Sequence, residues 1–291
     1  MKALAPIDTR DLLAPLHAEL IELLRGLSKE AWNRPTVAGD WRVRDVAAHL
    51  LDGQLRTVSS FRDAHLPPPD RPIDSYEDLV GFLDHLNASW VAVARRLSER
   101  VITDLLAWVG PEAAAALASL PLHEPALFSV AWAGEGKSTN WMHVGREFTE
   151  WWHHQAQIRE AVGAPPFFDP RWFQPLLDVS MRVLPTAYRS VQAETGATLA
   201  VEVDGSGVGW ALVRSAGRWE LFEGSPQRFD ARIDLDPETA WKTLYHALDP
   251  QTARSRARVV GDESLAAPFF AARSVMVATV AAPRNLDRRP R

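Results

Sequence analysis

Four ionisable side chains fall on one face of a helix that we predict over residues 140–162. They are His143, Glu147, Glu150 and His154. Their spacings of four, three and four residues place them on a single stripe. Trp151 and Ile158 flank this stripe, which indicates that it points at least partly inward. Buried carboxylates and imidazoles without partners are costly, so we expect these groups to be paired or bound to a metal ion.

Glu150 and His154 have the spacing that lets two side chains of one helix reach the same ion, as on the zinc helices of metalloproteases. A third ligand must come from another helix. His49 is the best candidate, because it is the only histidine of the second predicted helix and lies on its apolar side. Two histidines and one carboxylate around an open position are typical of a catalytic zinc site.

The spacing also allows an interpretation without a metal. Glu150 and His154 would then form a solvated pair worth about 0.3 kcal/mol, and His49 would be a core histidine bonded to a backbone carbonyl. His153 points about 100° away from His154 on the helix, so we expect it at the rim of the site or in contact with a ligand residue. His17 and His85 have no partner at ligand spacing, and we expect them on the surface or in packing.

The composition excludes several classes of function. The chain has no cysteine, so a cysteine nucleophile and thiolate zinc sites are ruled out, and thiol chemistry needs a thiol from a small molecule. A net charge of -5 without a dense basic run argues against nucleic-acid binding. We find no signal peptide and no apolar stretch of about 20 residues. We therefore expect a cytoplasmic protein that acts on a small molecule and binds neither nucleic acid nor membrane.

The elements that must position these residues are helices in the first half of the chain. Apolar residues at three- and four-residue spacing predict helices over 9–27, from about 43, over 79–97 and over 140–162. Ser75 followed by Asp78 predicts the start of the third helix. We read residues 111–141 as an irregular crossover. Four long helices with one long crossover predict a four-helix bundle.

The second half of the chain has a different pattern. After a helical piece over 173–188, alternating apolar residues and the turns "DGSG" and "SAG" predict β-hairpins. Asp236 caps a strand into a helix, and residues 256–279 read as a strand, a turn and a last helix. The predicted fold has two domains: a four-helix bundle over 1–165, a connecting helix and linker over 166–195, and a small α+β domain over 196–291.

Two segments resemble the DinB-like metalloprotein superfamily, and especially its mycothiol-dependent maleylpyruvate isomerases. "DWRVRDVAAHLLDGQLR" is similar to the signature of the second helix, whose residues are Trp41, Val43, Asp45 and His49. "TEWWHHQAQIREAVG" resembles the fourth-helix segment, whose residues are Glu150, His154, Ile158 and Arg159. "GDESLAAPFFAARSVMV" is more loosely similar to the sterol-carrier-like α+β domain of many members.

The resemblance implies a divalent metal held by His49, Glu150 and His154, usually zinc, with nickel as an alternative. It also implies a thiol cosubstrate such as mycothiol. Gln157 stands where the family has an aspartate, which alters a contact to a ligand or to the substrate. The segment "FSVAWAGEGKSTNW" also departs from the isomerase pattern, which leaves the substrate open.

The expected function is a thiol-dependent isomerase or transferase acting on a small electrophile, as a monomer or homodimer. Glu147 is the candidate proton shuttle, and Arg159 or Arg146 is the candidate for holding a substrate carboxylate. One alternative is a hydrolase that uses a metal-bound water with Glu147 as base. Another is a non-enzymatic protein that binds a hydrophobic ligand in its second domain, with a structural metal in the bundle.

Overall fold

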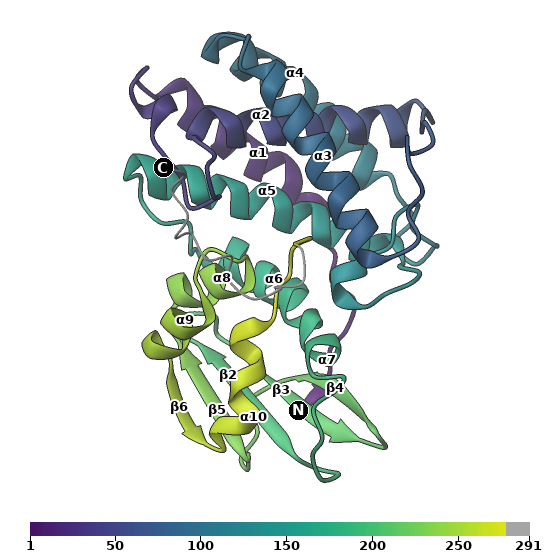
Figure 1. Cartoon of the computed structure of the whole chain (residues 1–291), viewed down its shortest axis with the longest axis vertical. Helices are drawn as coiled ribbons and strands as arrows, with labels where there is room; N and C mark the ends of the chain where they lie inside the picture. Colours follow the sequence, from purple (N-terminus) through teal and green to yellow (C-terminus); the bar gives the residue numbers. More distant parts are fainter. Residues whose placement is uncertain (278–291) are drawn as a thin grey trace, which may run out of the picture.

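The computed structural model describes residues 1–277 and shows a helical half stacked on an α+β half (Figure 1). Four helices form the bundle: α1 (Arg10–Arg25), α2 (Val43–Thr57), α4 (Glu99–Ala118) and α5 (Asn140–Val162). Both α4 and α5 pack against α1 and α2. A further helix, α3 (Tyr76–Ala94), lies on the outside against α2. The predicted fold class, a helical bundle followed by an α+β half, is confirmed.

The predicted bounds of the site helix are confirmed. α5 ends at Gly163, which adopts a left-handed φ of 72° that a residue with a side chain rarely takes. The predicted start of α3 is also confirmed, because the Ser75 hydroxyl accepts a hydrogen bond of 3.0 Å from the backbone N–H of Asp78.

The prediction of an irregular crossover from residue 111 was wrong for its first part. α4 runs through Pro111 to Ala118 as one helix. Its buried positions continue on both sides of the proline, including Leu106 and Leu117. Burial of this continuous apolar stripe therefore outweighs the roughly 3 kcal/mol that an interior proline costs a helix. As a result, α4 takes the bundle position that we had predicted for the third helix.

A buried histidine ties three bundle helices together. His17 of α1 bonds through Nε2 to the carbonyl of Leu106 on α4 (3.0 Å) and through Nδ1 to the Gln54 amide on α2 (3.1 Å). Burial lowers the pKa of His17 to about 4, so the ring is neutral at neutral pH. Gly110 makes room for it, because a Cβ there would lie 2.0 Å from His17 Nε2. His17 is thus a packing residue, as expected, and His85 is exposed on α3.

A six-stranded mixed sheet forms the second half, in the order β1-β4-β3-β2-β5-β6. The strands are β1 (Lys2–Ala3), β2 (Thr198–Val203), β3 (Gly209–Ser215), β4 (Arg218–Glu223), β5 (Ala231–Leu235) and β6 (Arg258–Gly261). β2 and β5 run parallel, and all other neighbours are antiparallel. The predicted hairpins and the cap at Asp236 are confirmed. The N-terminal strand β1 was not foreseen, so residues 2–3 belong to the second half by pairing.

The remaining helices of the second half are short, and the first of them packs against α5. They are α6 (Pro170–Ser180), α7 (Leu184–Ala187), α8 (Pro237–Leu244), α9 (Pro250–Arg256) and α10 (Glu263–Ala266). The predicted helix over 173–188 is split by a 3₁₀ turn into α6 and α7. The predicted last helix is α10 followed by a 3₁₀ segment, and residues 278–291 lie outside the described part of the chain. The domain boundaries at residues 165 and 195 stay predictions.

α6 and α8 lie between α5 and the sheet (Figure 1). The indole of Trp152 on α5 meets that of Trp241 on α8 edge to face, with ring centroids 6.2 Å apart. Lys242 of α8 pairs with Glu160 of α5. The bundle helix that carries the candidate ligands is therefore also the helix on which the second half docks.

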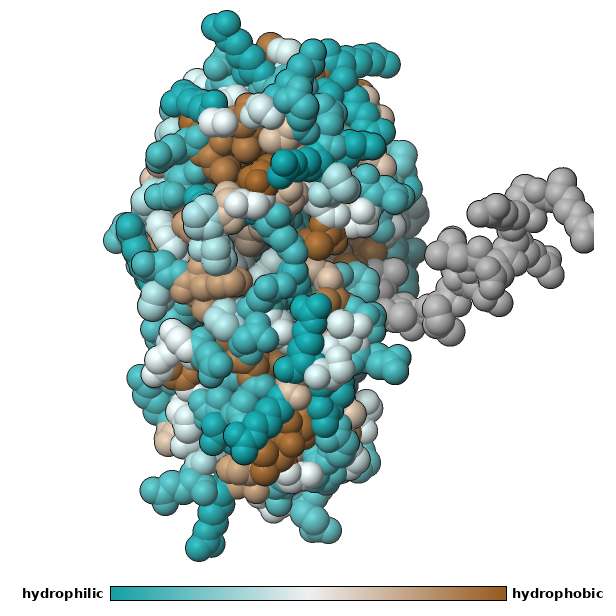
Figure 2. All heavy atoms as spheres, turned by 90° about the vertical axis from the view of Figure 1, so that its left-hand side faces the viewer, coloured by the Kyte–Doolittle hydropathy of each residue, from teal (hydrophilic) through white to brown (hydrophobic). Residues whose placement is uncertain are grey.

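The surface carries no continuous apolar face in the view that Figure 2 gives. Brown apolar patches there are separated by hydrophilic side chains, a distribution that is normal for globular proteins. Among the described helices, α4 alone has the length and hydropathy of a membrane span. Half of that stretch is buried, and the helix packs against α1 and α2.

We predict that Gly110→Ala destabilises the protein by about 2 kcal/mol, because the added methyl group overlaps the fixed His17 ring. Urea denaturation of the variant checks this. Gly81→Ala is the matched control, since no atom lies within 4 Å of its added Cβ, and it should be neutral or stabilising by up to about 1 kcal/mol. Gly110→Ala in a His17→Ala background should cost little. Equal stability of the two glycine variants would contradict the packing described.

Candidate metal centre

The three predicted ligands come together between α2 and α5. One ligand atom from each of His49, Glu150 and His154 lies within 4.8 Å of the others. His154 Nε2 is 3.3 Å from Glu150 Oε2, and the rings of His49 and His154 meet edge to face with centroids 4.6 Å apart. The spacing on α5 and the position on α2 thus lead to one cluster, although these residues lie about a hundred positions apart in sequence.

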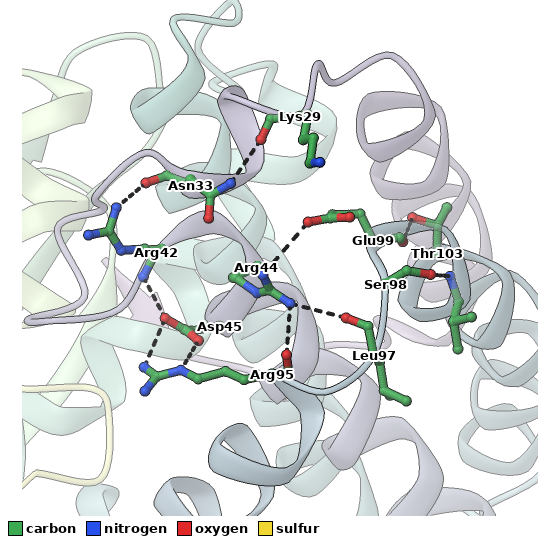
Figure 3. Close-up of polar contacts among 11 residues, drawn as sticks. Lys29, Asn33, Arg42, Arg44, Asp45, Arg95, Leu97, Ser98, Glu99 and Thr103 are labelled. Atoms are coloured by element: carbon green, nitrogen blue, oxygen red, sulfur yellow. Dashed lines mark hydrogen bonds and ion pairs between the residues drawn. The ribbon is translucent and has the colours of Figure 1, made fainter.

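The start of α2, one turn before His49, is fixed by a network of polar contacts around Asp45 (Figure 3). The buried Asp45 carboxylate accepts a hydrogen bond from the backbone N–H of Arg42 (3.1 Å) and another from Nε of Arg95 (3.0 Å). Arg44 in turn donates to the backbone carbonyl of Arg95 (3.3 Å). The network ties the first turn of α2 to the connection between α3 and α4. His49 follows one turn after Asp45, so its position depends on this anchor.

The ring of Trp41 covers His49 from the side of the loop before α2. The two ring centroids are 5.2 Å apart. His49 Nδ1 is buried and has no hydrogen-bond partner among the described residues. Burial, and next to it the neighbouring His154, lowers the pKa of His49 to about 3. His49 is therefore a neutral imidazole at neutral pH, with a lone pair available on its ring.

Gln157 fixes the orientation of His154. Its side-chain oxygen lies 2.8 Å from His154 Nδ1, and the amide is buried. An amide oxygen can only accept, so His154 Nδ1 carries a hydrogen toward Gln157, and Nε2 is the ring nitrogen that faces Glu150. Gln157 thus occupies the place of a residue that supports a candidate ligand. The difference from the expected aspartate is that this acceptor is neutral.

Glu150 is ionised within the cluster. Burial alone would raise the pKa of Glu150, but hydrogen bonds and charge from His153 and His154 outweigh it and hold the pKa well below its usual range. Glu150 Oε2 lies 3.3 Å from His154 Nε2 and 3.7 Å from His153 Nε2. The carboxylate therefore faces two imidazoles of its own helix, and its negative charge favours a proton or a bound cation at this point of the cluster.

His153 touches Glu150 from the side opposite α2. Its Nε2 is 3.7 Å from Glu150 Oε2, and its ring stacks on Tyr245 with centroids 4.6 Å apart. Tyr245 belongs to the second half of the chain and shares a hydrogen bond of 2.7 Å with the Ser180 hydroxyl. His153 thus contacts a candidate ligand, which is one of the two positions that we expected for it. It also connects the cluster to the second half of the chain.

Glu147 lies one turn before Glu150 and is buried. Burial raises the pKa of Glu147, and its side chain pairs with Arg146. A carboxyl group that keeps its proton to higher pH can act as a proton donor or acceptor near neutrality.

Arg56 is the functional candidate that sequence reasoning missed. It pairs with Asp52 of α2 at 2.9 Å, and its charge acts on both His49 and Glu147. Arg56 follows His49 by seven residues, which places it on the same face of α2. This spacing of seven residues is the feature of the sequence that could have identified Arg56 as a candidate.

The structure does not bring Arg159 into the cluster. Its guanidinium pairs with Glu19 of α1 at 3.1 Å and lies 4.5 Å over the ring of Phe167. His143, at the other end of the stripe, is fully buried against the rings of Phe61 and Phe128. The stripe therefore divides into a cluster with ligand geometry and an aromatic end.

Comparisons with known proteins identify a family for the first half of the chain and a solved structure with a similar fold. The family model described as mycothiol maleylpyruvate isomerase N-terminal domain matches residues 13–159. No curated protein matches the chain. A crystal structure of a mycothiol-dependent maleylpyruvate isomerase has a TM-score of 0.53 and 11% identity, over 84% of this chain and 91% of that one. A mutant of that isomerase gives the same score and coverage at 10% identity.

The second half has a weaker match of its own. A UbiJ-SCP2 ubiquinone synthesis protein is 23% identical over 35% of this chain and 90% of that chain, with a TM-score of 0.24. That score is too low for an argument about fold, so the sterol-carrier-like assignment stays a prediction.

The matched segment contains α1 to α5 apart from the first three residues of α1 and the last three residues of α5, and it includes His49, Glu150 and His154. It covers half of the chain, and the likeness to the solved isomerase extends over both halves. The chain belongs to the mycothiol maleylpyruvate isomerase N-terminal domain family.

Proposed function

We propose that this protein is a metal-dependent enzyme that uses a low-molecular-weight thiol such as mycothiol to isomerise or conjugate a small electrophile. The observation that carries the proposal is the convergence of His49, Glu150 and His154, whose ligand atoms lie within 4.8 Å of one another in a member of this family. A cation bound among them would be coordinated by all three side chains.

The donor set suits a divalent metal. Ligand atoms about 2.1 Å from a tetrahedral ion lie about 3.4 Å from one another, close to the distance between Glu150 Oε2 and His154 Nε2. Two imidazoles and one carboxylate leave a fourth position for a ligand, and these donors suit zinc, with nickel as an alternative. Two further observations support a metal site. His49 Nδ1 is buried without a hydrogen-bond partner among the described residues, and Gln157 accepts a hydrogen bond from His154 Nδ1 and so orients that ring.

When bound, such a metal supplies Lewis acidity that lowers the pKa of a thiol and holds it as the thiolate. The protein's own groups would then position the electrophile. Arg56 offers a partly exposed guanidinium beside His49, suited to a substrate carboxylate. Arg159 is the weaker candidate for that role, because its guanidinium pairs with Glu19 of α1 outside the cluster, whereas the charge of Arg56 acts on His49 and Glu147. Glu147, with its raised pKa, would give or take the proton at the reacting carbon.

The remaining expectations are part of the same proposal. We propose that the protein works in the cytoplasm on a small molecule, as a monomer or homodimer, without binding nucleic acid or membrane. Its acidic net charge is in keeping with the absence of a nucleic-acid partner.

We predict that Gln157→Leu weakens zinc binding by about 10- to 100-fold, because His154 loses the acceptor that orients its ring. Gln157→Glu should bind zinc at least as tightly as the natural protein, since a carboxylate is a stronger acceptor. Competition with a chromophoric chelator measures both affinities. Thermal unfolding of the metal-free proteins is the control for a general loss of structure. Unchanged zinc affinity of Gln157→Leu would show that Gln157 does not support a ligand.

We predict that the protein, purified without a histidine tag, turns over maleylpyruvate only in the presence of mycothiol. His49→Ala and His154→Ala should lower the rate by more than about 100-fold, because each removes a metal ligand. His85→Ala, on the exposed face of α3, is the matched control and should keep full activity.

Other electrophiles with a conjugated double bond should be assayed with the same thiol, since the substrate is open within the family. Turnover that survives in both ligand variants would exclude the proposed centre. Zinc-dependent ester cleavage that needs no thiol would instead support the hydrolase alternative.

A further inference from the structure

A second cavity lies at the junction of α7, the segment before α5 and the β3–β4 hairpin, with a volume of about 580 Å³. It is lined by Gly134, Pro185, Thr186, Arg189, Arg214, Gly217, Arg218 and Trp219. None of these residues belongs to the His49, Glu150 and His154 cluster. We propose that this cavity binds a small organic dianion, either a phosphate ester or a dicarboxylate. The inference does not depend on the proposed function.

The charge of the cavity is the first argument. Three of its eight lining residues are arginines and none is acidic. Arg218 pairs with Glu220. Among residues 1–277, neither Arg189 nor Arg214 has a carboxylate oxygen within 4.0 Å. Two guanidiniums at one cavity therefore lack a counter-charge in a protein whose net charge is -5.

The fold assembles these cations from separate segments. Arg214 and Arg218 lie on neighbouring strands, joined by a tight turn in which Ala216 and Gly217 have φ of 43° and 87°. Arg189 follows α7, about 25 residues earlier in the chain. The concentration of charge is thus a product of the tertiary structure, and the sequence shows no basic run here.

Fixed contacts hold the walls in place. The Thr186 hydroxyl donates to the carbonyl of Ala133 (2.7 Å), and Gly134 packs so closely that a Cβ there would lie 2.2 Å from Thr186 Oγ1. Trp219 is buried and donates through its indole N–H to the carbonyl of Val191 (3.1 Å). The cavity therefore has rigid walls before any ligand enters, which lowers the entropic cost of binding.

Trp219 also places one of the cations. The guanidinium carbon of Arg214 lies 5.7 Å from the centroid of the Trp219 ring, within cation–π distance. A planar guanidinium held in this way presents its N–H donors in a fixed direction, suited to two oxygens of a carboxylate or phosphate.

The number of cations and the volume define the ligand class. A neutral ligand would leave Arg189 and Arg214 uncompensated, and a single charge would compensate one of them. A volume of about 580 Å³ lies in the range of small-molecule sites. Phosphate esters and dicarboxylates share two negative charges on planar or trigonal oxygen groups, which is the chemistry that paired arginines recognise.

Isothermal titration of the full chain at low ionic strength tests the proposal, with glycerol phosphate, a phosphate monoester, in one arm and succinate in the other. We expect saturable binding of at least one anion, weakened about tenfold by Arg214→Gln and by Arg189→Gln. Arg228→Gln is the matched control, because it removes the same charge from an exposed residue of the second half outside the cavity. It should change the affinity less than twofold.

The comparison of the two anions distinguishes the two ligand classes. Binding of glycerol phosphate alone identifies a phosphate ester site, and binding of succinate alone identifies a dicarboxylate site. Circular dichroism confirms the fold of each variant, and the exposed Arg189 provides a substitution that leaves the core intact. No saturable binding of either anion, or equal affinity of all three variants, would overturn the proposal.

Discussion

An ionised carboxylate inside the helical half is the constraint on which the rest of the structure depends. Glu150 is surrounded by histidines, and burial works against its charge. A carboxylate that is largely removed from water, as Glu150 is with 25% of its side chain exposed, persists only with compensating partners, because the solvation that it loses is worth several kcal/mol. His153 and His154 contact it, and His49 lies within ligand distance of it. A divalent cation is the proposed source of further compensating charge.

The helix that carries Glu150, α5, makes contacts on two of its faces. One face turns toward α2 and presents the candidate ligands. The other faces α6 and α8, where Trp152 meets Trp241 and Lys242 pairs with Glu160. His153 joins the two faces, because it contacts Glu150 on one side and stacks on Tyr245 on the other. The second half of the chain therefore supports the position of a ligand, in addition to any binding role of its own.

Local patterns were sufficient to predict the site helix and the convergence of His49, Glu150 and His154 as candidate ligands. Helical periodicity separated His154 from His153, and an N-terminal cap and a terminal glycine marked α3 and α5. Features that depend on contacts between distant segments could not be predicted from local patterns. The continuation of α4 through Pro111 was not predicted, because the burial that outweighs the cost of a proline depends on contacts with α1 and α2. The pairing of β1 with β4 joins residues about 220 positions apart, which no local pattern encodes.

Contacts between distant segments also decide where the arginines lie. Arg159 was expected near a substrate because it follows His154 by about one turn, but its rotation on the helix directs it to Glu19 of α1. Arg56 was visible only through its offset of seven from His49, a weak signal on a helix with other charges. The arginines of the second cavity come from separate segments, so their proximity required the folded chain.

Anomalous diffraction tests the central claim most directly. Crystals of the untagged protein would be grown with one equivalent of zinc and measured on both sides of the zinc absorption edge. The account predicts one anomalous peak bonded to His49, to a carboxylate oxygen of Glu150 and to His154 Nε2, at about 2.0–2.2 Å from each, with Gln157 still bonded to His154 Nδ1. A map without a peak among these three residues would contradict it.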